Sequence, residues 1–163
     1  MLVQEIKNYY QVSPQLATSG QPSRSQFQEI ADAGYDAVIN LALPTSDNAI
    51  ADEGAIVTAM GMAYFQIPVV WEAPKLEEVR LFFGIMQSLE NRKIWVHCAK
   101  NMRVSCFVYL WQKYVLNLSE SEALYPMDRI WKPEGVWQQL ISDARSEWDS
   151  AIDTETRSVT FRA

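Results

Sequence analysis

The sequence predicts an α/β fold, a compact three-layer domain whose small, mostly parallel central sheet is flanked by helices. Segments with the period of strands alternate along the chain with segments that carry a helical stripe. Nearly half of the residues, 48%, are apolar, which is enough for a full core. A chain of 163 residues fits one such core. We therefore expect residues 1–148 to form a single domain and residues 149–163 to be a C-terminal tail or an edge strand.

Turn and cap signals divide the first half of the chain. Ser23 with Gln26 fits a capping box at the start of a helix that Gly34 ends. A second helix is predicted over residues 48–60. Short apolar segments predict three strands, at residues 16–19, 36–41 and 63–69. Pro68 indicates that the last of these strands is finishing or lies at an edge.

The second half opens with a helix after Pro74, followed by a short strand at residues 94–96. The helix that begins near Arg103 has the clearest apolar stripe in the chain. A further helix from Ser119 to Ile130 and a last one from Pro133 follow. We expect the strand at 94–96 to be central, because ligands collect at the carboxyl ends of such strands.

Composition excludes several classes of protein. With 14 basic and 20 acidic residues the chain is not a general nucleic-acid binder, and no apolar run approaches the ~20 residues of a membrane span. One histidine and two cysteines fit neither a structural zinc site nor a disulfide framework, so we expect no metal and no cofactor. Free thiols and an N-terminus without an apolar signal segment predict a cytoplasmic protein. Nothing in the sequence indicates the oligomeric state.

The stretch VHCAKNMRVS, residues 96–105, joins the predicted central strand to its helix. It holds His97, the single histidine, beside Cys98, and Arg103 stands at the helix start. A helix start offers unpaired N–H groups and about half a positive charge, so a loop around it binds anions. Thiols in such surroundings ionise more readily, with a pKa that falls from ~8.5 to ~3.5–7.5. The stretch therefore predicts a nucleophilic thiolate in an oxyanion-binding loop, with an arginine that can hold phosphate through two parallel hydrogen bonds.

This pattern resembles the signature of the cysteine-based protein tyrosine and dual-specificity phosphatases. Two other blocks, SGQPSRSQFQEIADAGYDAVINLALP at 19–44 and YFQIPV at 64–69, resemble a bacterial phosphatase-like family that also occurs fused to beta-lactamase-like hydrolases. The resemblance covers roughly residues 15–140. It implies a phosphoric monoester hydrolase that forms a cysteinyl phosphate, acts on a phosphorylated protein or a small-molecule phosphate ester, and needs no cofactor.

The resemblance also implies a role for each residue of the stretch. Cys98 would be the nucleophile, Arg103 would bind phosphate and stabilise the transition state, and His97 would support the backbone of the cysteine. Ser105 would hydrogen-bond the thiolate and help it leave; its hydroxyl can equally bond back to the helix backbone. Backbone N–H groups that line the phosphate site would come from Ala99, Lys100, Asn101 and Met102.

The general acid lies outside this stretch, because the family usually takes an aspartate from a loop before the cysteine. Here the loop after residues 64–69 reads VVWEAP and offers only Glu72. Glu72 is therefore the predicted acid, and Asp47 and Asp52 are alternatives. Trp71, beside it, is expected to form a wall of the pocket.

Two departures keep other functions open. Four residues separate Cys98 from Arg103, where the phosphatases usually have five, and Val104 precedes Ser105. A gap of four resembles the rhodanese sulfurtransferases, which would carry a persulfide on the same cysteine. The missing aspartate allows a third hypothesis, a catalytically weak phosphate-binding module. Cys106 is expected to pack in the core.

Overall fold

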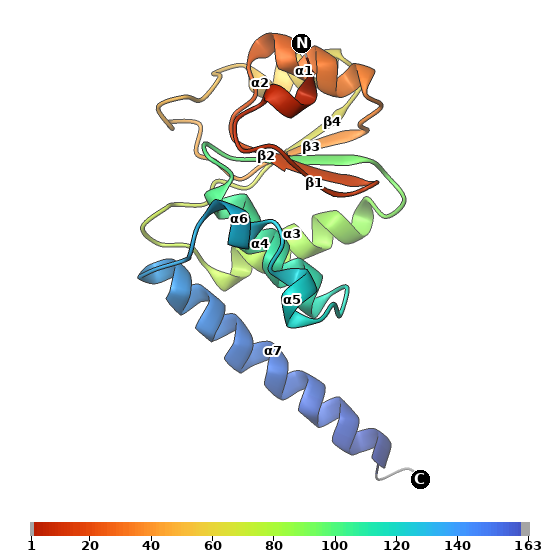
Figure 1. Ribbon diagram of the computed structural model, residues 1–163, viewed down its shortest axis with the longest axis vertical. Coiled ribbons are helices and arrows are strands. Elements are labelled where there is room, and N and C mark those ends of the chain that lie inside the picture. The colour runs from red at the N-terminus through yellow and green to blue at the C-terminus, as the bar shows by residue number, and fades with distance from the viewer. Residues whose placement is uncertain (1, 161–163) are drawn as a thin grey trace.

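A single five-stranded sheet organises the molecule (Figure 1). The computed structural model describes the backbone of residues 2–160 and the side chains of residues 2–151. The strands lie in the order β1-β2-β5-β3-β4, so β5 is central, as predicted. All neighbours are parallel except β1 and β2, which confirms the α/β class with a mostly parallel sheet. The strand bounds are β1 (Tyr10–Ser13), β2 (Leu16–Ser19), β3 (Ala37–Asn40), β4 (Ala63–Gln66) and β5 (Ile94–His97).

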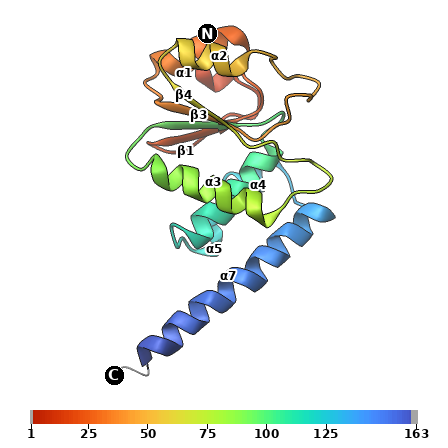
Figure 2. The same ribbon diagram turned by 180° about the vertical axis from the view of Figure 1, so that it is seen from behind.

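Helices cover both faces of the sheet (Figures 1 and 2). On one face lie the short 3-10 helix η1 (Val3–Glu5), α1 (Arg24–Asp32) and α2 (Glu53–Ala59). On the other face lie α3 (Leu76–Ser88) and α4 (Met102–Tyr114), with α5 (Glu120–Ala123) and α6 (Met127–Ile130) beside α4. The three predicted layers are therefore present.

Each face of the sheet has its own buried core. Phe27 and Val57 pack with Trp95 on the α1 and α2 side, while Phe82 and Phe107 pack with the neighbouring Val96 on the α3 and α4 side. Successive side chains of a strand point to opposite faces, so β5 supplies both cores from adjacent residues. Full burial of one such side chain stabilises the fold by ~1.5–3 kcal/mol, and β5 is therefore held from both sides.

The cap signals in the sequence are confirmed. Ser23 and Gln26 form the capping box of α1, and Gly34 follows this helix with a φ of 82°. Ser119 and Glu122 form the second box, at the start of α5. The two capping boxes read from the sequence thus mark the starts of α1 and α5 correctly.

Some boundaries differ from the prediction. The helix expected over 48–60 begins only at Glu53, and the strand expected over 63–69 ends at Gln66, before Pro68. The helix expected from Ser119 to Ile130 is divided into α5 and α6, because Pro126 between them has no N–H to continue it. The sequence does not reveal β1, whose residues alternate between half-buried and exposed and so carry no apolar signal.

The C-terminal helix α7 (Val136–Thr160) corrects the expectation for residues 149–163. Residues 149–160 continue this helix and form neither a tail nor an edge strand, and residues 161–163 lie outside the described residues. No glycine or proline follows Gly135, so nothing in the sequence stops the helix. The helix contacts α3 and α4 and extends away from the sheet (Figures 1 and 2). Among residues 2–160, we find no helix with the length and apolarity that crossing a membrane requires.

Candidate active site

The stretch singled out in the sequence forms the connection between β5 and α4. His97 ends the strand, residues 98–101 form the loop, and Met102 begins the helix. Asn101 adopts the left-handed conformation at a φ of 64°, which turns the chain sharply into α4. The loop therefore wraps around the positive end of a 13-residue helix.

A cavity of about 380 Å³ opens at this loop. Cys98 lies at the cavity although only 1% of its surface is exposed, and Arg103 lies there with 8% exposed. Trp71 forms a wall, as predicted, and its ring centroid is 5.7 Å from the Arg103 guanidinium carbon. The remaining lining residues are Ala99, Lys100 and Met102. The structure thus brings the predicted nucleophile and the predicted phosphate ligand to one cavity.

Arg103 has an open hydrogen-bonding capacity. Within residues 2–151 its guanidinium has no carboxylate partner, and its buried Nε has no hydrogen-bond partner at all. An unpaired buried cation is costly, because the protein does not replace the water that it loses. The side chain is therefore suited to an anion that enters the cavity.

The loop is anchored from behind by residues far away in the sequence. The Asn101 side chain turns away from the cavity and donates from Nδ2 to the Asn8 carbonyl (2.8 Å) and to Thr18 Oγ1 (2.9 Å). The Ala99 carbonyl accepts from the Gln21 N–H (3.3 Å) and from Asn48 Nδ2 (3.2 Å). We call residues 98–101 and the start of α4 the cup. Asn101 can thus contribute its backbone N–H to the cup, while its side chain fixes the turn. Neither Asn48 nor Gln21 is recognisable from the sequence.

Gly20 lies so close to the loop that it leaves no space for a side chain. A Cβ at this position would be 2.9 Å from the Ala99 carbonyl oxygen and 3.1 Å from that of Lys7. Both atoms belong to backbone and cannot swing aside. The turn Gly20-Gln21-Pro22, which looks like a plain turn in the sequence, therefore supports the cup directly.

We predict that Gly20→Ala displaces the loop. Stability should fall by about 1–3 kcal/mol, as overpacking usually costs, and phosphate-analogue affinity should fall with it. Urea unfolding and vanadate titration measure the two effects. Gly84→Ala is the matched control, because a Cβ there meets nothing within 4 Å and sits inside α3, where alanine favours the helix. Equal stability of the two variants would contradict the close approach.

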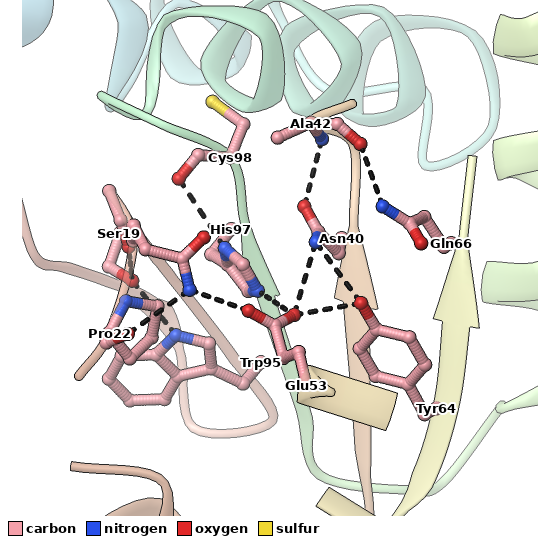
Figure 3. A network of polar contacts seen from close by, with 12 residues as sticks. Ser19, Pro22, Asn40, Ala42, Glu53, Tyr64, Gln66, Trp95, His97 and Cys98 are labelled. Atoms are coloured by element: carbon pink, nitrogen blue, oxygen red, sulfur yellow. Dashed lines mark hydrogen bonds and ion pairs between the residues drawn. The ribbon is translucent and has the colours of Figure 1, made fainter. Parts of the chain in front are cut away.

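Behind Cys98, a buried carboxylate holds the histidine (Figure 3). His97 Nε2 is 2.8 Å from Glu53 Oε2, and His97 Nδ1 is 3.4 Å from the Cys98 carbonyl oxygen. Glu53 is only 3% exposed and also accepts hydrogen bonds from Gln21, Asn40 and Tyr64. In the sequence Glu53 looks like an ordinary acidic residue within the helix expected over residues 48–60, so it is absent from the predicted site.

The Ser105 hydroxyl bonds back to the helix backbone, which is the second of the two roles expected from the sequence. Its hydroxyl donates to the Met102 carbonyl (2.9 Å) and accepts from Trp131 Nε1 (3.0 Å). Ser105 is fully buried and does not line the cavity. In this state the side chain ties the first turn of α4 to the Trp131 ring.

Glu72 lies beside a second cavity, of about 550 Å³, which also has Trp71 and Met102 in its wall. The two cavities are therefore adjacent, with Glu72 exposed on the outer one. Neither alternative acid lines the inner cavity. Asp47 is exposed on its loop, and Asp52 is exposed and pairs with Arg24.

A mostly parallel sheet with a cysteine after its central strand and an arginine in the next helical turn fits the class of the cysteine-based dual-specificity phosphatases. The family model described as "DSP-PTPase phosphatase fused to NAD+ Kinase" matches residues 5–150. The chain belongs to this family, which confirms the resemblance, although the fusion partner in the description is a kinase and not a beta-lactamase-like hydrolase. Among curated proteins no sequence matches.

Solved structures agree with the fold. The DUF442 protein of Shewanella putrefaciens CN-32, described as a candidate phosphatase, is 37% identical with a TM-score of 0.80, over 90% of this chain and 96% of that one. The catalytic domain of the PP-IP phosphatase SIW14 from S. cerevisiae has a TM-score of 0.66 at 15% identity, over 93% and 94% of the two chains. PTPMT1 in complex with PI(5)P has a TM-score of 0.74 at 12% identity, over 88% and 98%. The last two are similar to this chain in fold alone.

Proposed function

We propose that the chain hydrolyses phosphoric monoesters through a cysteinyl-phosphate intermediate. One observation carries the proposal: Cys98 and the unpaired, buried Arg103 lie at the same cavity at the start of α4. The cavity offers a nucleophile together with a guanidinium and helix-start N–H groups that suit the oxygens of a phosphoryl group. Its substrate would be a phosphorylated protein or a small-molecule phosphate ester.

The reaction would proceed in two displacements. The Cys98 thiolate attacks phosphorus, a sulfur–phosphorus bond forms, and the bond from phosphorus to the leaving oxygen breaks. Arg103 and the loop N–H groups stabilise the charge on the equatorial oxygens. The leaving oxygen takes a proton from the acid, for which Glu72 is the candidate. Water then gives one proton to the carboxylate left on the acid and attacks phosphorus, the sulfur–phosphorus bond breaks, and inorganic phosphate, the thiolate and the reprotonated acid are regenerated.

The intermediate provides the test of this function. Brief incubation with an aryl phosphate, acid quenching and peptide mass spectrometry should find one phosphoryl group on the peptide that contains Cys98. The Cys106→Ala variant should give the same modification, because Cys106 is fully buried in α4. Turnover without any phosphorylated cysteine would refute the mechanism.

Glu72→Gln tests the general acid. The variant should lower kcat by about 10²–10⁴ for alkyl phosphates, whose leaving oxygen must be protonated. It should change p-nitrophenyl phosphate hydrolysis much less, because that phenolate leaves without a proton. Steady-state kinetics on both substrates measure the difference, and Glu134→Gln, in the wall of the same outer cavity, is the matched control. Equal losses on the two substrates would exclude Glu72 as the acid.

The sequence spacing supplies one alternative activity. The gap of four residues from Cys98 to Arg103 also suits a rhodanese-like persulfide. Thiosulfate with cyanide should then yield thiocyanate, and a persulfide on Cys98 without phosphate turnover would select sulfur transfer. Vanadate binding without either turnover would select a phosphate-binding module.

We further propose that residues 1–148 are one catalytic domain that acts in the cytoplasm. Cys98 and Cys106 are both free, and a nucleophilic thiol must stay reduced to act. The expected absence of a cofactor follows from the same mechanism, since thiolate, guanidinium and water complete the reaction.

A further inference from the structure

The contact network behind the loop has a chemical consequence for the nucleophile (Figure 3). Glu53 comes from the first turn of α2, on the opposite face of the sheet from α4, and reaches His97 at the end of β5. His97 is completely buried, and the ring of Phe27 from α1 lies 5.9 Å from its own. The imidazole is therefore fixed between a carboxylate and the backbone of Cys98.

The partners of Glu53 show that its carboxyl group is ionised. Oε1 accepts from Gln21, and Oε2 accepts from Asn40 Nδ2 (3.1 Å) and the Tyr64 hydroxyl (2.8 Å). Asn40 is oriented unambiguously, because its Oδ1 accepts the N–H of Ala42. Burial alone would raise the pKa of the Glu53 carboxyl, but the hydrogen bonds from His97, Gln21 and Tyr64 hold that pKa below its ordinary value.

Both neighbours of the imidazole are then acceptors. An ionised carboxylate can only accept from Nε2, and a carbonyl oxygen can only accept from Nδ1. Protons on both ring nitrogens would let His97 donate to both acceptors at once. The geometry thus fits an imidazolium paired with the Glu53 carboxylate inside the protein.

We propose that Glu53 is a positioning residue for the nucleophile, which holds His97 doubly protonated beneath the loop so that the charged ring fixes the Cys98 backbone and favours the thiolate. The inference rests on the proposed function in one respect, that Cys98 is the group that reacts. Glu53 acts through His97 and does not contact the substrate cavity.

Other charged groups near Cys98 come from different elements. Arg103 of α4 and Lys100 of the loop are the basic residues that line the cavity. Glu72 stands on the outer cavity. Tyr64 of β4 faces Glu53, and burial, ahead of the nearby Glu53 charge, raises the pKa of its hydroxyl, so it remains a neutral donor. The contribution of Glu53 is therefore separable, because it alone acts from behind the loop through the ring.

The single histidine makes a direct test possible in the wild-type protein. Imidazole ¹⁵N–¹H NMR of the full chain, prepared without an affinity tag, reports only on His97. We expect protons on both ring nitrogens at pH 7. A neutral ring with one bare nitrogen would overturn the proposal, whatever the catalytic activity of the protein. This measurement requires no variant and so does not depend on whether a substituted chain folds.

The second test measures the reactivity of Cys98 as pH changes. The rate of alkylation by iodoacetamide follows the thiolate fraction, and buried Cys106 should not react. Glu53→Gln should move the midpoint of the rate profile up by about one pH unit, because a neutral amide no longer holds the second proton on His97. Tyr64→Phe is the matched control, since it removes one donor to Glu53 and keeps the charge.

The outcomes distinguish the positioning role of Glu53 from the proposed hydrolase function. A shift in Glu53→Gln with little change in Tyr64→Phe supports the positioning role. No shift in Glu53→Gln, or equal shifts in both variants, overturns it. A wild-type protein that fails to hydrolyse aryl phosphates would contradict the proposed function. The alkylation result could still be interpreted, because alkylation needs no phosphate turnover.

Discussion

Cys98→Ser is expected to reduce aryl phosphate hydrolysis on the order of 10⁴-fold or more, because a serine hydroxyl in this loop is not ionised and cannot replace the thiolate. Phosphate or vanadate should still compete for the site in binding measurements, since Arg103 and the loop N–H groups are unchanged. The combination of lost turnover and retained anion affinity indicates that Cys98 acts in the chemical step and not in binding. Steady-state kinetics and isothermal titration of the same preparations measure both.

Cys106→Ala is the control for the loss of a thiol. Burial raises the pKa of the Cys106 thiol, which keeps this group protonated and inert in the core. The variant should lose some thermal stability, through the small cavity it leaves, and keep its turnover. Substantial phosphatase activity in Cys98→Ser, or a matching loss in Cys106→Ala, would contradict the assignment of the nucleophile.

Arg103→Lys is expected to lower kcat/KM by about 10²–10³, the usual loss when a donor to transition-state charge is removed. Lysine keeps the positive charge but not the planar pair of donors that matches two phosphate oxygens. Within residues 2–151 the buried Nε has no hydrogen-bond partner, so this atom is free to bind an anion. Affinity for vanadate should therefore fall together with the rate.

Arg129→Lys is the matched control, because this exposed arginine of α6 pairs only with Asp128, at 3.7 Å, among residues 2–151. It should leave both the rate and the vanadate affinity unchanged. A rate for Arg103→Lys within a few-fold of the wild type would show that the guanidinium does not contact the reacting phosphoryl group.

The fold could be predicted from local patterns wherever one residue or pair defines an element. Gln26 three positions after Ser23 and Glu122 three after Ser119 place two helix starts correctly. The pattern fails for β1, which has one pairing partner and no fully buried residue. It also fails at the end of α7, where the amino acids after residue 149 are mostly polar but include no glycine or proline that would break a helix.

The cavity could be predicted in part, because Cys98, Arg103 and the loop between them are contiguous in the sequence. Trp71 can be predicted as well, because it lies in the loop that follows β4, another strand of this sheet. Glu53 and Gly20 cannot be predicted, because their importance depends on contacts with residues 44 and 79 positions away. Only the folded sheet shows that both lie against the loop.

The placement of β5 between β2 and β3 links the reactive thiol to the most protected part of the molecule. Its backbone is paired on both edges and its side chains are covered on both faces, so the position of Cys98 at the end of β5 should persist until the whole sheet is lost. The loop after Cys98 is instead tied to Asn8 and Asn48 outside the strands, so mild heat or denaturant should weaken anion binding before the sheet unfolds.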